Sequence, residues 1–458
     1  MSKNAEIRTD LQTHNKQRSV CVFSTGCTES RMDAALLQQF FQERSNWRVC
    51  QACAKAEVII LLGCCATQDK EDLARETIEW LRQTRGADAH ILVTGCITKI
   101  QPGLAGKNDN LNGLMEQING LLDLKDRQDL AANSPQPEFW QIGKDILEPA
   151  VAANMIRRYC HRDVGSSWLK VFPKCQAALI RVFTAYRRWV DKEILTSSDG
   201  TYCMKVSTGC LGTCSYCSIR LARGHVVSKN PDILVKEFQR GIDQGCRDFA
   251  LLGTDIGDYG KDLGTDLLDL LERLVMHKGK FILRLRNVNP RWLIPSANRF
   301  SEFLKTGKIG YILSPMESGS NRILDLMNRR YHVEDYLEAI EKIRKAWPGI
   351  FIKNQVMVGF PGETQEDFNK TRQILKLGLF DYTDVCAFTR RPKTRAWNLS
   401  DQVPDEIIAR RYRNLRFMSF VQLPLKRWLS SCVLKYRCPG NTGRNPSTSS
   451  LSGQRVSK

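Results

Sequence analysis

Three cysteines stand close together in the middle of the chain, at Cys210, Cys214 and Cys217. Their C-x3-C-x2-C spacing presents three thiolates on one side of a tight loop. Iron–sulfur cubanes are normally held by four thiolates, so this triplet would leave one iron free to bind another molecule. A zinc knuckle or an ordinary cysteine-rich loop is the alternative, but structural zinc takes four ligands and no partner knuckle flanks the triplet. The spacing therefore favours a cubane with an open iron.

Length and cysteine usage indicate a metal-binding protein of the cytoplasm. The 458 residues suffice for two or three domains, and the chain has 17 cysteines. No apolar run reaches the roughly 18 residues of a membrane span, and the polar stretch from Met1 to Gln17 does not resemble a signal peptide. We therefore expect a cytoplasmic protein with no membrane partner, whose cysteines bind metal rather than form disulfides.

The chain is strongly basic, and much of the excess charge lies near its end. The net charge is +19, and from Ala387 onward 15 Lys and Arg stand against Asp401, Asp405 and Glu406. Such a charge favours a polyanionic partner such as nucleic acid. A solvated basic tail is the alternative.

Residues 18–128 alternate between strand and helix patterns, which predicts a small α/β domain with a parallel sheet. The predicted elements are Ser19–Ser24, Met32–Glu43, Val58–Leu62, Lys70–Arg85 and His90–Thr94. Gly-Cys follows each predicted strand, which brings Cys27, Cys64 and Cys96 to one end of the sheet, where ligands of open parallel sheets bind. These three cysteines predict a second, auxiliary cluster. Cys65 directly follows Cys64 and is the alternative ligand; strand length favours Cys64.

Residues 129–200 are interpreted as a linker followed by a basic helical insert. Ser134 to Pro137 (SPQP) is typical of a linker. Within residues 151–195, arginines alternate with Tyr159, Trp168, Tyr186 and Trp189. This mixture suits RNA binding by stacking and phosphate contacts, and equally an amphipathic helix with its aromatics packed inward.

Strand and helix patterns alternate again over residues 201–400, which predicts an open or partial (β/α) barrel with its sites on the loops that follow the strands. Its last predicted strand, Phe351–Val358, runs into the glycine-rich segment from Gly359 to Thr364. Residues 401–458 are interpreted as a C-terminal helix, Ile407–Val421, and a basic, partly disordered tail.

Together these motifs resemble the methylthiotransferases of the radical S-adenosylmethionine (SAM) superfamily, which modify tRNA adenosines or a ribosomal protein. The resemblance covers residues 18–125 and 201–420. It rests on the two cysteine sets, Tyr216 within the triplet, and several further runs. These runs are Ala222-Arg223-Gly224, Leu252–Gly260, Arg284–Pro290, Ser318-Gly319-Ser320, Met327–Tyr331, Gly359–Thr364 and Arg390–Thr394. Leu211, Asp255-Ile256-Gly257 and Asn289-Pro290 lean toward the branch that modifies threonylcarbamoyladenosine beside the anticodon.

The resemblance implies two 4Fe-4S clusters, SAM as cofactor, a probable tRNA substrate, and an electron donor such as flavodoxin or ferredoxin. The triplet would hold the radical-generating cluster, and the trio Cys27, Cys64 and Cys96 the auxiliary one. Cofactor-binding residues would be Tyr216, Arg223, Gly359, Gly362 and Glu363. Thr254, Asp255 and Asp258 are further pocket candidates. No catalytic residue is expected beyond the clusters, because the cofactor supplies the chemistry.

Three departures from the family pattern bear on the substrate. The C-terminal segment is too short for the family's usual RNA-binding β-barrel, the stretch before residue 201 is longer than usual, and Glu317 replaces a common glutamine. One alternative is sulfur insertion into a small nucleoside or a peptide. A second is a non-catalytic RNA-binding protein with structural clusters.

Overall fold

The computed structural model describes residues 17–50, 53–65, 68–85, 90–104, 112–122 and 201–419. The predicted linker, the basic stretch 151–195 and the C-terminal tail lie outside these residues. The domain limits at 128/129, 200/201 and 400/401 therefore stay predictions. No helix in the described part of the chain is long and apolar enough to cross a membrane.

The N-terminal part is a four-stranded parallel sheet in the order β2-β1-β3-β4. The strands are β1 (Arg18–Ser24), β2 (Trp47–Val49), β3 (Val58–Gly63) and β4 (His90–Gly95). The helices are α1 (Thr28–Gln42), α2 (Gln68–Arg85), α3 (Cys96–Ile100) and α4 (Asn112–Leu122), with short 3-10 turns at Cys53–Lys55 and Pro102–Leu104. Every residue of β3 is buried, as expected for a parallel strand covered on both faces.

Alternate residues of these strands build two separate apolar layers. Ile59 and Leu61 belong to the layer that includes Ile78 of α2. Ile60 belongs to the opposite layer, with Leu37 of α1. Because side chains alternate between the faces of a strand, a continuous apolar run supplies both layers at once.

The larger part is a six-stranded parallel sheet in the order β12-β11-β10-β9-β8-β5. Its strands are β5 (Thr201–Lys205), β8 (Asp248–Leu252), β9 (Ile282–Leu285), β10 (Ile309–Glu317), β11 (Phe351–Val358) and β12 (Tyr382–Ala387). Each strand pairs with its neighbour in sequence, which is the arrangement of a partial (β/α) barrel. The α/β fold with a small sheet domain and a partial barrel is therefore confirmed.

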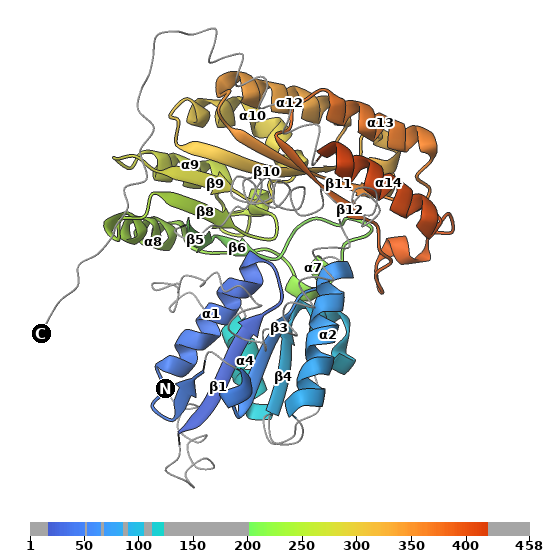
Figure 1. Ribbon diagram of the computed structural model, residues 1–458. Coiled ribbons are helices and arrows are strands. Elements are labelled where there is room, and N and C mark those ends of the chain that lie inside the picture. The colour runs from blue at the N-terminus through green and yellow to red at the C-terminus, as the bar shows by residue number, and fades with distance from the viewer. Residues whose placement is uncertain are drawn as a thin grey trace, which may run out of the picture.

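Helices cover the outer side of the barrel sheet (Figure 1). They include α8 (Pro231–Asp243), α9 (Leu267–Val275), α10 (Pro290–Leu304), α12 (Val333–Ala346) and α13 (Gln365–Lys376). The barrel part also contains α11 (Asn321–Leu326), α14 (Asp405–Phe417) and the 3-10 turns η8 (Ile256–Asp258) and η9 (Arg395–Asn398). The predicted last helix, residues 407–421, thus differs from α14 at both ends.

The two sheet domains meet through a short helix. Two short antiparallel strands of two residues each, β6 (Ser207–Thr208) and β7 (Val227–Ser228), pair with one another. The chain between them carries the cysteine triplet and α7 (Ile219–Arg223). Figure 1 shows α7 between the domains, and it packs against α3. The carboxyl ends of the N-terminal strands therefore face the barrel loops.

Candidate functional site

The cysteine triplet occupies a loop whose entry requires glycine. Gly209 has a φ of +75°, and a Cβ at this position would lie 1.9 Å from the His225 carbonyl oxygen. The Cys210 amide donates to the Gly224 carbonyl 3.2 Å away, which closes the loop at the far end of α7. The pairing of β6 with β7 thus brings both ends of the triplet segment together.

The run Met327–Tyr331 supports the triplet loop from the barrel side. The Ser215 amide donates to the Met327 carbonyl at 3.0 Å, and the Asn328 side chain donates to Thr213 Oγ1 at 2.7 Å. Asn328 has a φ of +57°, a left-handed conformation that few residues other than glycine adopt and that is enriched at functional sites. This run, quoted in the sequence only as a motif, therefore shapes the cysteine loop.

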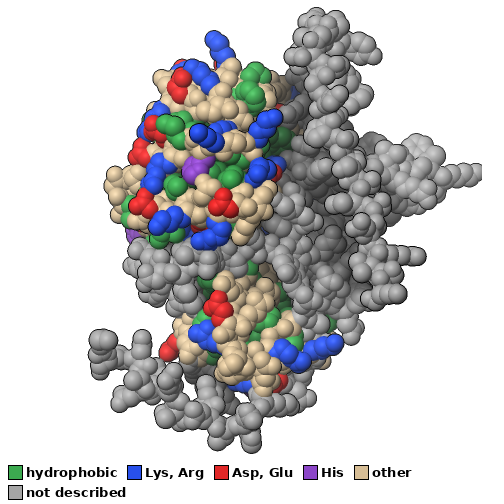
Figure 2. Space-filling view, turned by 90° about the vertical axis from the view of Figure 1, so that its left-hand side faces the viewer, with side chains coloured by type: hydrophobic (Ala, Val, Ile, Leu, Met, Phe, Trp, Pro, Cys, Tyr) green, Lys and Arg blue, Asp and Glu red, His purple; other side chains and the backbone are tan. Residues whose placement is uncertain are grey.

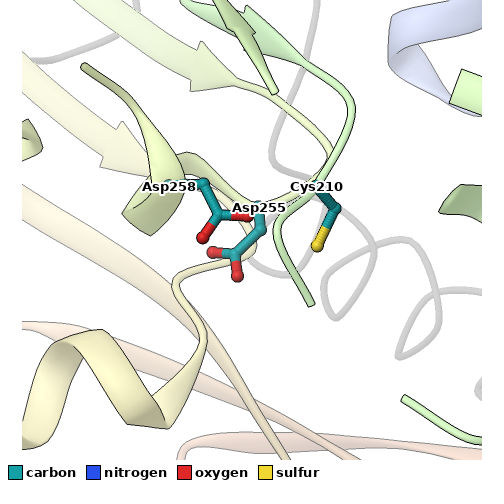
Figure 3. Close-up of side chains that lie close together, drawn as sticks. All are labelled: Cys210, Asp255 and Asp258. Atoms are coloured by element: carbon teal, nitrogen blue, oxygen red, sulfur yellow. The ribbon is translucent and has the colours of Figure 1, made fainter. Parts of the chain in front are cut away.

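Two carboxylates lie next to the first cysteine. Cys210 Sγ and one oxygen each of Asp255 and Asp258 lie within 4.8 Å of one another (Figure 3). Asp258 is fully buried, accepts from the Leu211 amide at 2.6 Å, and pairs with Arg291 at 2.6 Å. Burial and the neighbouring Asp258 raise the pKa of Asp255 to about 7. The predicted pocket candidates Asp255 and Asp258 are therefore brought to the triplet.

The other two cysteines face the end of β10. An Arg329 N–H lies 3.5 Å from Cys214 Sγ, and the same guanidinium is 4.0 Å from Glu317. Burial, followed by the neighbouring Cys214, raises the pKa of the Cys217 thiol to about 11. Tyr216 is directed toward the glycine-rich segment, where its ring packs edge-on against Phe360. Tyr216 therefore lies next to the glycine-rich segment.

The glycine-rich segment is a tight turn that its own acidic side chain stabilises. Gly359 and Gly362 have φ values of +77° and +81°. The Glu363 carboxylate accepts from the Gly359 amide at 2.7 Å and from Arg411 at 2.7 Å. Glu363 therefore holds this turn together, and any contact it makes with a cofactor has to accommodate both bonds.

The N-terminal cysteine trio converges at the carboxyl end of its sheet. Cys27 immediately precedes α1, Cys64 follows β3, and Cys96 begins α3. A hydrogen bond with Cys64, together with burial, raises the pKa of the Cys27 thiol to about 12. Burial also raises the pKa of the Cys96 thiol, and the neighbouring Arg223 guanidinium opposes this shift.

Cys64 and Cys65 have different surroundings. Cys64 contacts Cys27, whereas Cys65 is fully buried among apolar side chains such as Phe23 and Ile78. Burial is the main cause that raises the pKa of the Cys65 thiol to about 12, and the neighbouring Cys96 adds to it. A hydrogen bond with the Ser218 side chain acts in the opposite direction. Geometry therefore supports Cys64 as a member of the trio.

Arg223 lies at the trio and not at the triplet. Its Nε donates to Cys96 Sγ at 3.1 Å, and an Nη donates to the Asp33 carboxylate of α1 at 2.9 Å. The same carboxylate accepts from Lys205, at the end of β5, at 2.9 Å. The sequence did not single out Asp33 or Lys205, since a charged residue in a helix pattern is usually exposed and nothing local marks these two as buried.

The residues present fit two iron–sulfur clusters and an organic cofactor. Each set brings three sulfurs together, as a cubane with an open iron requires, and the Cys65 thiol lies beside the trio, near Cys96. The Gly212 amide donates to Cys210 Sγ at 3.1 Å. Among the described residues, Thr208 Oγ1 and Thr254 Oγ1 are buried without a hydrogen-bond partner, which is typical of groups that bind a ligand.

Comparison with known proteins matches both halves of the chain. The model of the radical SAM superfamily matches residues 204–375, and that of uncharacterized protein family UPF0004 matches residues 19–114. A probable threonylcarbamoyladenosine tRNA methylthiotransferase of Archaeoglobus fulgidus is 26% identical over 404 residues, covering 86% of this chain and 82% of that protein. The ribosomal protein uS12 methylthiotransferase RimO of Chlamydia pneumoniae is 25% identical over 405 residues, covering 87% and 76%.

The chain belongs to the radical SAM methylthiotransferase family. It is accordingly a radical SAM methylthiotransferase enzyme. A third relative, the tRNA-2-methylthio-N(6)-dimethylallyladenosine synthase of Finegoldia magna, is 32% identical over 226 residues, covering 48% of each protein. Members named for three different substrates thus resemble this methylthiotransferase to similar degrees.

A solved structure supports the fold of this methylthiotransferase. The radical SAM methyltransferase TsrM of Kitasatospora setae, with cobalamin and a 4Fe-4S cluster bound, superposes with a TM-score of 0.51 at 14% identity. The match covers 83% of this chain and 77% of TsrM. At this identity the likeness concerns the fold alone.

Proposed function

We propose that this enzyme inserts a methylthio group into a C–H bond of a tRNA adenosine beside the anticodon. It would use SAM, a radical-generating 4Fe-4S cluster on Cys210, Cys214 and Cys217, and an auxiliary 4Fe-4S cluster on Cys27, Cys64 and Cys96. A flavodoxin or ferredoxin would donate the electrons. We place this reaction in the cytoplasm, together with its tRNA substrate.

The observation that best supports this proposal is that the cysteine triplet and the N-terminal cysteine trio face one another. Helix α7 begins two residues after Cys217, and its last residue, Arg223, touches Cys96 of the other set. A substrate carbon has to meet a hydrogen-abstracting radical and a sulfur donor in turn. Two clusters on opposing surfaces allow both steps at one substrate position.

The cofactors, when bound, supply the electron, the hydrogen-abstracting radical and the sulfur. The chain's own residues position them and exclude water. Asp258 fixes the triplet loop through the Leu211 amide, and Arg329 donates toward Cys214. The turn with positive φ values at Gly359 and Gly362, which suit glycine, lies beside Tyr216, and we place the adenosyl part of SAM there.

The threonylcarbamoyladenosine branch is favoured within this proposal. Relatives named for that activity, from Archaeoglobus fulgidus and Pyrococcus horikoshii, match 86% of the chain. The motif residues Asp255-Ile256-Gly257 and Asn289-Pro290 point the same way. On the face seen in Figure 2 basic and acidic side chains are intermingled. We assign the tRNA contacts to the segments 151–195 and 420–458 because their sequences are basic; both lie outside the described residues.

A ribosomal protein is the second candidate substrate. The RimO relative of Chlamydia pneumoniae matches 87% of the chain at almost the same identity as the tRNA-modifying relatives.

The decisive experiment uses the full chain reconstituted without oxygen. Iron is counted, and the protein is incubated with SAM, dithionite and either unmodified tRNA or ribosomal protein, followed by mass spectrometry of nucleosides and peptides. About eight irons per chain and a methylthio-adenosine support the tRNA proposal. 5′-Deoxyadenosine with a modified ribosomal protein and unmodified tRNA supports the second candidate. Four irons, unaffected by Cys27→Ala and lost in Cys210→Ala, would contradict the two-cluster mechanism.

A further inference from the structure

One arginine links the triplet loop to the auxiliary trio across the domain boundary. Arg223 ends α7, only a few residues beyond Cys217, yet its side chain reaches the N-terminal domain. There its Nε lies 3.1 Å from Cys96 Sγ and its Nη1 lies 2.9 Å from Asp33. Its side chain is 13% exposed and that of Asp33 is 5% exposed, so solvent screens this contact weakly.

Asp33 determines the direction in which the guanidinium donates. One oxygen of the Asp33 carboxylate accepts from Arg223, and the other accepts from Lys205 Nζ at 2.9 Å. The Lys205 side chain is also only 5% exposed. A carboxylate held by two cations cannot rotate freely, and it fixes one edge of the planar guanidinium. The remaining Nε–H then points at Cys96. A lysine in place of Arg223 could not supply this geometry, since its donors converge on one nitrogen.

A hydrogen bond to a sulfur ligand changes the energetics of the iron it holds. Reduction adds negative charge to a cluster, and a cationic donor stabilises the more negative state, which raises the reduction potential. The effect is larger where the donor is charged and buried, because the local dielectric is low. The corresponding arginine at the triplet, Arg329, lies farther from its sulfur, at 3.5 Å.

We propose that Arg223 is a positioning residue that raises the reduction potential of the auxiliary cluster through its hydrogen bond to Cys96, with Asp33 and Lys205 holding it in place. This inference rests on the proposed function, since it requires a cluster on Cys27, Cys64 and Cys96. It assigns Arg223 to the sulfur-donating cluster rather than to SAM. The same contact orients α7, the helix that follows the triplet, against the trio. One side chain therefore contacts the trio and positions the helix next to the triplet.

The test isolates the auxiliary cluster by replacing Cys210, Cys214 and Cys217 with alanine in the full chain. Its midpoint potential is measured by dithionite titration followed by electron paramagnetic resonance, alone and with Arg223→Gln, Arg223→Lys or Asp33→Asn added. We expect about four irons per chain in all four proteins. We expect a lower potential in both Arg223 variants, and a smaller decrease in Asp33→Asn, where Arg223 remains but loses its charged partner.

Arg286→Gln is the matched control. Arg286 also crosses the domain boundary, donating to Thr28 Oγ1 of α1 at 2.7 Å rather than to a cysteine sulfur. Its replacement removes a cation at the boundary but no hydrogen bond to sulfur, so it should shift the potential less than Arg223→Gln does. A cluster whose potential is the same with and without Arg223, or one shifted equally by Arg286→Gln, overturns this inference alone. A triple-alanine protein without iron overturns the inference and the two-cluster proposal together. Should Arg223→Gln fail to fold, Arg223→Lys and Asp33→Asn decide the question.

Discussion

The guanidinium of Arg391 lies against the carboxylate of Glu71, although the two residues are 320 positions apart in the chain. Both side chains are buried, and the contact joins the segment after β12 to α2 of the N-terminal domain. The other Glu71 oxygen accepts from Arg75 at 3.1 Å and from Gln101 at 2.6 Å. One carboxylate therefore fastens the two domains through a contact separate from that of Arg223.

Replacing Glu71 by glutamine should destabilise the protein, because it leaves the buried Arg391 charge without a partner. Breaking a buried ion pair from one side typically costs about 3–5 kcal/mol. Urea unfolding followed by tryptophan fluorescence measures the loss. Glu338→Gln, which removes an exposed pair with Lys342, should leave the unfolding midpoint nearly unchanged. Equal midpoints for Glu71→Gln and the unmodified protein would contradict a docking role.

Cys64→Ala and Cys65→Ala should differ in iron content. Cys64 contacts Cys27, so its loss should remove the auxiliary cluster and lower the iron count from about eight to about four per chain. Cys65 packs among Phe23 and Ile78, and its loss should mainly lower stability by leaving a small cavity. Iron analysis after anaerobic reconstitution distinguishes the two. The reverse pattern would make Cys65 the ligand.

Gly209→Ala should disrupt the triplet loop more than Gly224→Ala does. Both glycines have a positive φ, +75° and +74°, but an added Cβ meets the His225 carbonyl at 1.9 Å only at Gly209, and nothing within 4 Å at Gly224. Gly224→Ala should cost about 1–3 kcal/mol of backbone strain. Gly209→Ala should in addition lose iron from the triplet, as counted by iron analysis. Similar iron content in the two variants would argue against a steric requirement at Gly209.

Stability should fall in acid partly through Asp367, which caps α13. Burial alone would raise the pKa of Asp367, but hydrogen bonds from Arg322, Ser320 and Thr364 outweigh it and hold that pKa below its ordinary value. The unfolded carboxyl titrates near about 3.9. The contribution is therefore complete above that pH and is lost as pH falls toward the lower folded value.

Asp367→Asn tests this pH dependence. The variant should be less stable than the unmodified protein at pH 6, and the difference should shrink as unfolding is measured down to pH 3. Glu366→Gln is the control, since Glu366 is exposed and forms an i,i+4 ion pair with the exposed Lys370. A difference between Asp367→Asn and the unmodified protein that stays constant with pH would rule out the charged form as its origin.

Local pattern was sufficient for the architecture and for the chemistry of the sulfurs. The continuous apolar run of β3 predicted a parallel sheet, because a strand buried on both faces is apolar at every position. The Gly-Cys pairs after three strands predicted cysteines at one edge, because the carboxyl ends of parallel strands lie at the same edge of the sheet. The spacing of Cys210, Cys214 and Cys217 predicted a loop of three thiolates. The start of α1 was missed by four residues, since Thr28 to Arg31 carry no apolar periodicity.

Only the tertiary structure decided which charges these sulfurs meet. The residues around Arg223 in the sequence do not indicate that its side chain contacts Cys96 and Asp33. Those around Glu71 do not indicate its contact with Arg391. Glu363 read as a cofactor residue, yet packing turned its carboxylate to Arg411. A buried charge takes whichever opposite charge the packed domains bring within hydrogen-bond distance, because an unpaired one is costly. That choice depends on contacts between residues hundreds of positions apart, which periodicity and spacing do not encode.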